Sequence, residues 1–166
     1  DAVSYTAQSL LPLIGAELWF TGEAAPEGTP LRQRQRALEL LGRWSGEMNE
    51  HMPEPLIYAA WLRNLQSRMI EDELGPLAEE LIHVEPLFIE RAFRDIDGAS
   101  KWCDVIQSAP RETCADMARL ALDDAIEVRR RGRLAARVET ATLEALAVAR
   151  VEVVVFRGLV GQHHPR

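Results

Sequence analysis

Histidines are the first residues of this chain whose chemistry could support metal binding. His163 and His164 are adjacent within the last four residues of the sequence. Adjacent histidines do not easily converge on one ion without further ligands, so a tail of this kind is expected to be solvated. His51 and His83 stand alone on separate predicted helical segments, where a surface or capping role is typical. The sequence therefore predicts no metal site.

Clustered carboxylates are the next candidates, because paired acids can serve as general acid and general base. Such catalysis needs two carboxyl groups in a cleft with pKa values shifted apart. Consecutive acids on a helix mostly point outward into water instead. No serine lies in a Gly-x-Ser-x-Gly turn, and no Gly-rich phosphate loop occurs. The motifs nominate no catalytic residue, and the acidic clusters set aside are Glu71, Asp72 and Glu73; Glu79 and Glu80; and Asp123 and Asp124.

Cys103 and Cys114 are the only cysteines in the chain. Zinc sites use cysteines roughly two to four residues apart and need about four ligands, so this spacing disfavours zinc. A disulfide fits better, and closing a loop of this length contributes roughly 3 kcal/mol in the chain-entropy model. Such a bridge implies an oxidising compartment. Two buried, reduced thiols are the alternative, since free cysteine is often buried.

The strongest helix signal runs from Pro55 to Gly75. Its apolar residues recur three, four and seven positions apart on one stripe. Gly75 and Pro76 form a typical helix ending, a left-handed cap residue followed by a helix breaker. The stripe comprises Tyr58, Trp61, Leu62, Leu65 and Met69.

Two further helices are predicted before this one. The first runs from Ser4 to about Phe20 and is kinked or started near Pro12. The second is opened by Thr29–Pro30 and terminated by Gly46, because threonine caps free N–H groups and proline suits the first helical position.

Two more helices are predicted in the second half of the acidic region. One spans Leu77 to Phe93 with a bend at Pro86, and an irregular stretch from Asp95 to Ala109 follows it. The last starts at Pro110. The predicted fold is therefore all-α, an irregular bundle of about five helices with an unplaced C-terminal stretch. The apolar residues expected on the last helix are Met117, Leu120, Leu122 and Ile126.

Charge divides the 166-residue chain after Val128. Residues 1–128 contain 11 Lys and Arg against 23 Asp and Glu, a net charge of −12, whereas residues 129–166 contain 8 against 3, a net charge of +5. An acidic body argues against nucleic acid as a partner, because such binding needs clustered Lys and Arg. No stretch reaches about 18 uninterrupted apolar residues, so no membrane span is predicted. The chain opens at Asp1 without a signal segment, so an internal starting point is expected.

Six segments carry a resemblance when they are taken in order. They are Leu38 to Met48 (LELLGRWSGEM), Glu54 to Leu62 (EPLIYAAWL), Asp72 to Gly75 (DELG), Trp102 to Asp104 (WCD), Glu112 to Asp116 (ETCAD) and Ala121 to Ala125 (ALDDA). This ordered set resembles the helical part of the β subunit of penicillin acylase family enzymes. The likeness covers about residues 1–128.

That family consists of N-terminal nucleophile hydrolases. A serine freed at the start of the β subunit attacks amide bonds of penicillins, related β-lactams or acyl-homoserine lactones. Such a nucleophile is activated by its own α-amino group and must be residue 1, whereas residue 1 here is Asp. The family order places the oxyanion hole, the substrate arginine and the calcium-binding acids upstream. No catalytic, cofactor or metal residue is therefore carried over, and the resemblance implies helices beside the catalytic core, with a bridged cysteine pair in some members.

The resemblance predicts a structural fragment of an amidohydrolase that is inactive alone. Its expected partners are the α subunit and the catalytic core of the β subunit, with self-association through exposed apolar faces. The family and the cysteine pair predict a periplasmic or secreted protein, although the cytoplasm stays open. The alternative is a free-standing helical interaction module without enzymatic activity.

Residues 129–166 depart from the Trp-rich continuation that the resemblance implies. They contain no Asp, Lys or Trp and are rich in Arg, Ala and Val. This change predicts that the tail is an out-of-frame translation of GC-rich coding sequence. A genuine lineage-specific extension is the alternative, since chain termini tolerate additions.

Overall fold

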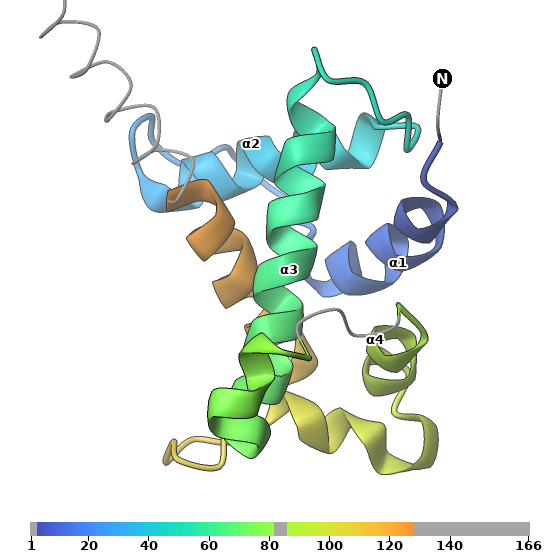
Figure 1. Ribbon diagram of the computed structural model, residues 1–166. Helices are drawn as coiled ribbons and strands as arrows, with labels where there is room; N and C mark the ends of the chain where they lie inside the picture. Colours follow the sequence, from blue (N-terminus) through green and yellow to red (C-terminus); the bar gives the residue numbers. More distant parts are fainter. Residues whose placement is uncertain (1–2, 82–85, 128–166) are drawn as a thin grey trace, which may run out of the picture. The chain divides into compact units, whose positions relative to one another are not determined.

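The computed structural model describes residues 3–81 and 86–127, which are predominantly helical (Figure 1). They form no β-sheet, and a single isolated bridge pairs Val3 with Glu47. The all-α prediction is confirmed. The chain separates into two units, Asp1–Glu127 and Val128–Arg166, and the predicted tail lies outside the described residues. Within the described part, no helix combines the length and the apolarity that crossing a membrane requires.

Helix α3 (Pro53–Leu74) is the longest described helix, and the others lie around it in Figure 1. It begins two residues before the predicted start, because Pro53 suits the first turn as well as Pro55 does. It ends as predicted at Gly75, whose positive φ of 51° is available to glycine at little cost. The predicted stripe is buried except for the half-buried Leu62, and the most deeply buried side chains are Trp61, Leu65 and Met69.

Helices α1 (Tyr5–Gly15) and α2 (Pro30–Arg43) precede α3. The hydroxyl of Ser4 accepts a hydrogen bond from the Ala7 N–H at 3.1 Å, which caps α1. Pro12 lies inside α1, and a short 3₁₀ helix, η1 (Ala16–Leu18), continues it. Thr29 caps α2 in the same way, as predicted, by accepting from the Arg32 N–H at 3.2 Å.

The single bent helix predicted from Leu77 to Phe93 is wrong. The structure has a 3₁₀ helix, η2 (Gly75–Glu79), and a separate helix, α4 (Pro86–Phe93). Proline at a first helical position both prevents continuation of a preceding helix and starts a new one, so Pro86 marks a beginning instead of a bend.

The stretch predicted as irregular contains a kinked 3₁₀ helix, η3 (Ile96–Cys103). Asp95, Asp97 and Gly98 all have positive φ values, of 51°, 57° and 72°. Aspartate tolerates this region better than most residues because its short polar side chain bonds locally. Asp95 does so by accepting from the Ser100 N–H at 3.1 Å.

The last described helix spans residues 114–127 and begins later than the predicted Pro110. Thr113 and Asp116 bond reciprocally at its start: the Thr113 hydroxyl accepts from the Asp116 N–H at 3.2 Å, and Asp116 accepts from the Thr113 N–H at 3.1 Å. This capping box fixes the beginning of the helix. Its buried face differs from the predicted one, because Leu120 and Ile126 are only half-buried. Small side chains replace them, and the buried set is Met117, Ala118, Ala121, Leu122 and Ala125.

Candidate functional sites

The two cysteines meet at the junction of η3 and the helix of residues 114–127. Cys103 and Cys114 lie at disulfide distance, with their Cα atoms 4.9 Å apart. Cys103 is buried, and next to it the ring of Trp102 meets that of Phe88 of α4 edge-on at 5.3 Å. Three elements therefore converge on this pair. Its environment is that of a structural bridge, because reactive cysteines lie in partly exposed, electropositive surroundings.

The loop between the two cysteines is anchored at both ends. Glu112 donates its N–H to the Asp104 carboxylate at 3.2 Å and accepts from the Val105 N–H at 3.2 Å. Farther along, the Ile106 N–H donates to the Asp72 carboxylate at 2.8 Å, which ties the loop to the end of α3. Asp72 thus satisfies a backbone group that the loop itself leaves free.

Glu73 follows Asp72 in the sequence, and its carboxyl group has a raised pKa. Partial burial and a hydrogen bond with the Asp72 carboxyl raise the pKa of Glu73 to about 7, and Lys101 acts in the opposite direction. Although burial raises the pKa of Asp72, hydrogen bonds with Glu73 and with the Ile106 N–H hold it below its ordinary value. The pair can hold one proton near neutral pH. A perturbed carboxyl of this kind is a candidate general acid by pKa alone, but its partner carboxylate already anchors a loop.

Asp123 and Asp124 remain partly exposed, but each binds an arginine of another helix, where the sequence-based expectation for consecutive acids is contact with water. Asp123 binds Arg34 of α2 through two bonds of 2.7 and 2.6 Å. Asp124 accepts from Arg68 of α3 at 2.7 Å. Adjacent positions on a helix diverge by about 100°, so the two carboxylates reach different helices. They join the helix of residues 114–127 to α2 and α3.

The described part of the chain contains no cluster of histidines. His51 is exposed, and its Nε2 atom lies 3.7 Å from Glu50. His83, His163 and His164 lie outside the described residues. Among the residues that the structure does describe, no three His, Cys, Asp or Glu side chains are grouped so that they could hold a metal ion.

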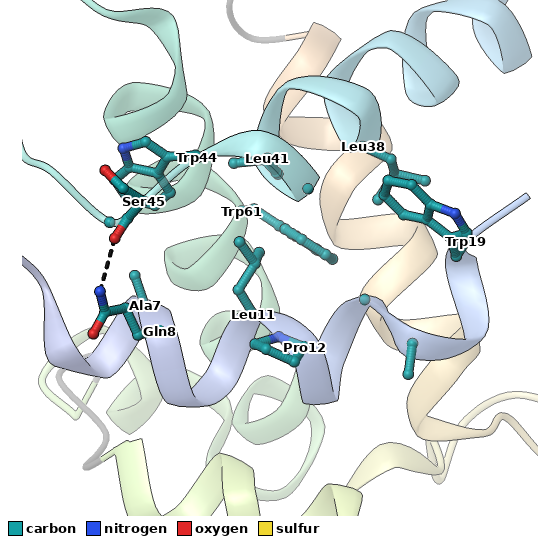
Figure 2. A pocket seen from close by; sticks show the side chains of 14 residues that line it. Ala7, Gln8, Leu11, Pro12, Trp19, Leu38, Leu41, Trp44, Ser45 and Trp61 are labelled. Carbon is teal, nitrogen blue, oxygen red and sulfur yellow. Dashed lines mark hydrogen bonds between the residues drawn. The ribbon is translucent and has the colours of Figure 1, made fainter.

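A groove with a volume of about 720 Å³ lies between α1 and the end of α2 (Figure 2). Trp61 of α3 forms its floor, and Trp19 and Trp44 lie toward its two ends. The Gln8 side chain donates to the Ser45 carbonyl at 2.8 Å and so spans the groove at one end. The full lining is Ala7, Gln8, Leu11, Pro12, Gly15, Ala16, Trp19, Leu38, Leu41, Gly42, Trp44, Ser45, Gly46 and Trp61.

Comparison with protein families gives a match to the model described as penicillin amidase, over residues 1–164. The chain belongs to the penicillin amidase family. No curated protein and no solved structure matches it. Membership in the penicillin amidase family indicates an amidohydrolase-type function.

In this penicillin amidase family member, the polar side chains considered above make contacts between elements. Asp72 holds the loop before the last described helix, and Asp123 and Asp124 hold that helix to its neighbours. The structure brings Cys103 and Cys114 together, whereas the acidic clusters stay apart on different helices.

Sequence reasoning missed the groove of this penicillin amidase family member. The one local sequence signal for the groove is glycine at a lining position where a larger side chain would meet a neighbouring ring. A Cβ atom at Gly42 would lie 2.5 Å from the Trp19 ring, so only glycine lets that ring lie against α2. The pairing of α1 with the end of α2 has no comparable signal in the sequence, because it depends on contacts between distant residues.

Proposed function

We propose that this chain is the helical part of a penicillin-amidase-type hydrolase that cleaves the amide bond of acylated substrates such as β-lactams or acyl-homoserine lactones. The family match over residues 1–164 carries the proposal. In this proposal the segment is structural, and the catalytic residues lie in other parts of the parent enzyme. Any calcium ion is likewise held outside the segment.

The helices support this role through contacts that use their charged side chains for packing. Arg34 and Arg68 each reach across to an acid of the helix of residues 114–127. The indole N–H of Trp61 donates to the Ala118 carbonyl at 2.7 Å inside the core. Such fixed contacts between helices suit a rigid support for a catalytic core.

Activity of the isolated chain tests the proposal. We expect the pure 166-residue chain to release no product from a chromogenic phenylacetyl amide, because the activated nucleophile of such an enzyme is the first residue of its own subunit. A complete penicillin amidase assayed in parallel is the positive control. Clear turnover by the pure chain, abolished by heat denaturation, would contradict the proposal.

The partners in this proposal are the α subunit and the catalytic core of the β subunit. The large apolar side chains that the described elements leave exposed are the ones that such partners would cover. The cysteine pair supports a periplasmic or secreted location, where disulfides persist. The most exposed large apolar residues are Tyr5, Leu56, Leu87 and Ile106.

The same exposed residues also favour the second candidate, a free-standing helical interaction module. Light scattering on the pure chain distinguishes the two. A fragment with uncovered packing surfaces should self-associate as its concentration rises, whereas a module should stay monodisperse until its partner is added. A monodisperse chain at high concentration would favour the module.

A further inference from the structure

The C-terminal end of α3 carries a surface that combines exposed apolar side chains with uncompensated acids. It is formed by residues 71–81 and by the loop of residues 104–112, which the Cys103–Cys114 pair closes at its base. In Figure 1 this loop lies beside η2 at the end of α3. We propose that this surface binds a basic amphipathic helix of another protein. This inference does not depend on the proposed function.

The loop holds an apolar side chain in a fixed position. Ile106 is 70% exposed, yet its N–H is bound by the Asp72 carboxylate at 2.8 Å. Two residues on, the Ser108 N–H donates to the Val105 carbonyl at 3.0 Å, and the Ser108 hydroxyl donates to the Glu112 carboxylate at 2.7 Å. An exposed isoleucine on a loop that is already ordered costs little conformational entropy when a partner covers it.

Two further apolar side chains are exposed at the same end of α3. Leu77 lies in η2 and Leu81 follows it, and they are 57% and 53% exposed. Gly75 of η2 and Gln107 of the loop line a common hollow with a volume of about 380 Å³, so η2 lies next to the loop that carries Ile106. These side chains are accessible to a partner, and apolar residues of the partner would be needed to cover them.

Charge specifies the partner further. Residues 69–90 contain no Lys or Arg. Within the described residues, Glu71, Glu79 and Glu80 are exposed and form no ion pair. Complementary charge favours a partner with Lys or Arg, whereas a second copy of this chain would bring the same acids and be repelled. An amphipathic helix with a basic polar face offers both the apolar and the cationic groups.

The test is a fluorescence-anisotropy titration of the full chain into a fluorescein-labelled synthetic helix of leucine and lysine, with the leucines on one face. Two labelled peptides of the same length are controls: in one serine replaces leucine, and in the other glutamate replaces lysine. We expect saturable binding of the leucine–lysine helix alone. Added salt should weaken this binding, because it screens the exposed charges.

Variants of the chain locate the binding. Ile106→Ser should weaken it by roughly tenfold, because the burial of this side chain is lost. The double variant Glu79→Gln with Glu80→Gln should weaken it and reduce its dependence on salt. Leu56→Ser and Glu50→Gln change exposed residues at the opposite end of α3 and are the matched controls, which should leave the affinity unchanged within about twofold. Circular dichroism verifies that each variant is folded.

Three results would overturn the proposal. The first is equal binding of the leucine–glutamate helix, or no saturable binding of the leucine–lysine helix. The second is an equal loss of affinity in Ile106→Ser and Leu56→Ser, because the attraction would then not be confined to this surface. The third is a sedimentation experiment in which the chain is a dimer that Ile106→Ser dissociates, since the surface would then hold a second copy of the chain.

Discussion

Because Asp72 and Glu73 share a proton, the free energy of unfolding should fall as pH rises through the pKa of Glu73. Partial burial and the neighbouring carboxyl raise the pKa of Glu73 from its ordinary 4.5 to about 7. The folded chain therefore binds this proton more tightly than the unfolded chain does. Stability from this group is fully present below pH 4.5 and is lost as pH rises to about 7.

Glu73→Gln should remove this loss, because glutamine keeps the shape of the side chain and carries no titratable proton. We expect the variant to gain melting temperature relative to the unaltered chain at pH 8 and to gain little at pH 4. Thermal unfolding followed by circular dichroism at both pH values measures the difference. Glu71→Gln, two residues earlier on α3, is the matched control. An equal pH dependence in all three proteins would show that Glu73 is not coupled to Asp72.

At the scale of elements, the cysteine bridge joins η3 to the helix of residues 114–127. Opening it should cost roughly 3 kcal/mol of unfolding free energy, because the unfolded chain regains the freedom of the closed loop. The double variant Cys103→Ala with Cys114→Ala should unfold at correspondingly lower denaturant concentration.

Thiol counting tests the same bridge independently. In denaturant without reductant we expect no reactive thiol, and after reduction we expect two per chain, since Cys103 and Cys114 are the only cysteines. Two reactive thiols before reduction would show that the pair is reduced in the protein as prepared.

Local chemistry made several elements predictable from the sequence. Thr29 and Pro30 start α2 through a side-chain cap and a fixed φ, and Gly75 ends α3 through a positive φ. These features act over a few residues, so they can be recognised in the sequence without knowledge of the fold. The Thr113–Asp116 capping box is an equally local signal, and it places the start of the last helix after the predicted Pro110.

Other elements depend on residues that are distant in the sequence. The 3₁₀ helix η3 is stabilised by the Cys103–Cys114 pair and by the contact of Trp102 with Phe88, and neither is visible in local periodicity. The groove has the same dependence, because its lining combines α1, α2 and α3. Periodicity predicts which face of a helix is apolar, whereas it does not predict which faces meet.

At the scale of the whole molecule, residues 1–128 carry an excess of acids, and arginines among them connect helices. Arg34 and Arg68 pair with adjacent acids on the helix of residues 114–127, so two helices are bound to a third by neighbouring residues. Ion pairs of this kind, half-buried and with several hydrogen bonds, contribute more than exposed pairs do. The excess of acids over cations is therefore compatible with a packed core.

The change of composition after Val128 leads to a prediction at the level of the gene. The charge reverses from −12 to +5, and Asp, Lys and Trp disappear from residues 129–166. A shift of reading frame in GC-rich coding sequence produces such a change, because out-of-frame codons there favour Arg, Ala and Val. The family match covers residues 1–164 and so includes most of this stretch, which favours an authentic sequence, and the nucleotide sequence decides between the two. We expect translation of the alternative frame after Val128 to yield a segment with Trp, Gly and His that continues the penicillin amidase sequence. If no such segment appears in either alternative frame, residues 129–166 are an authentic extension of this chain.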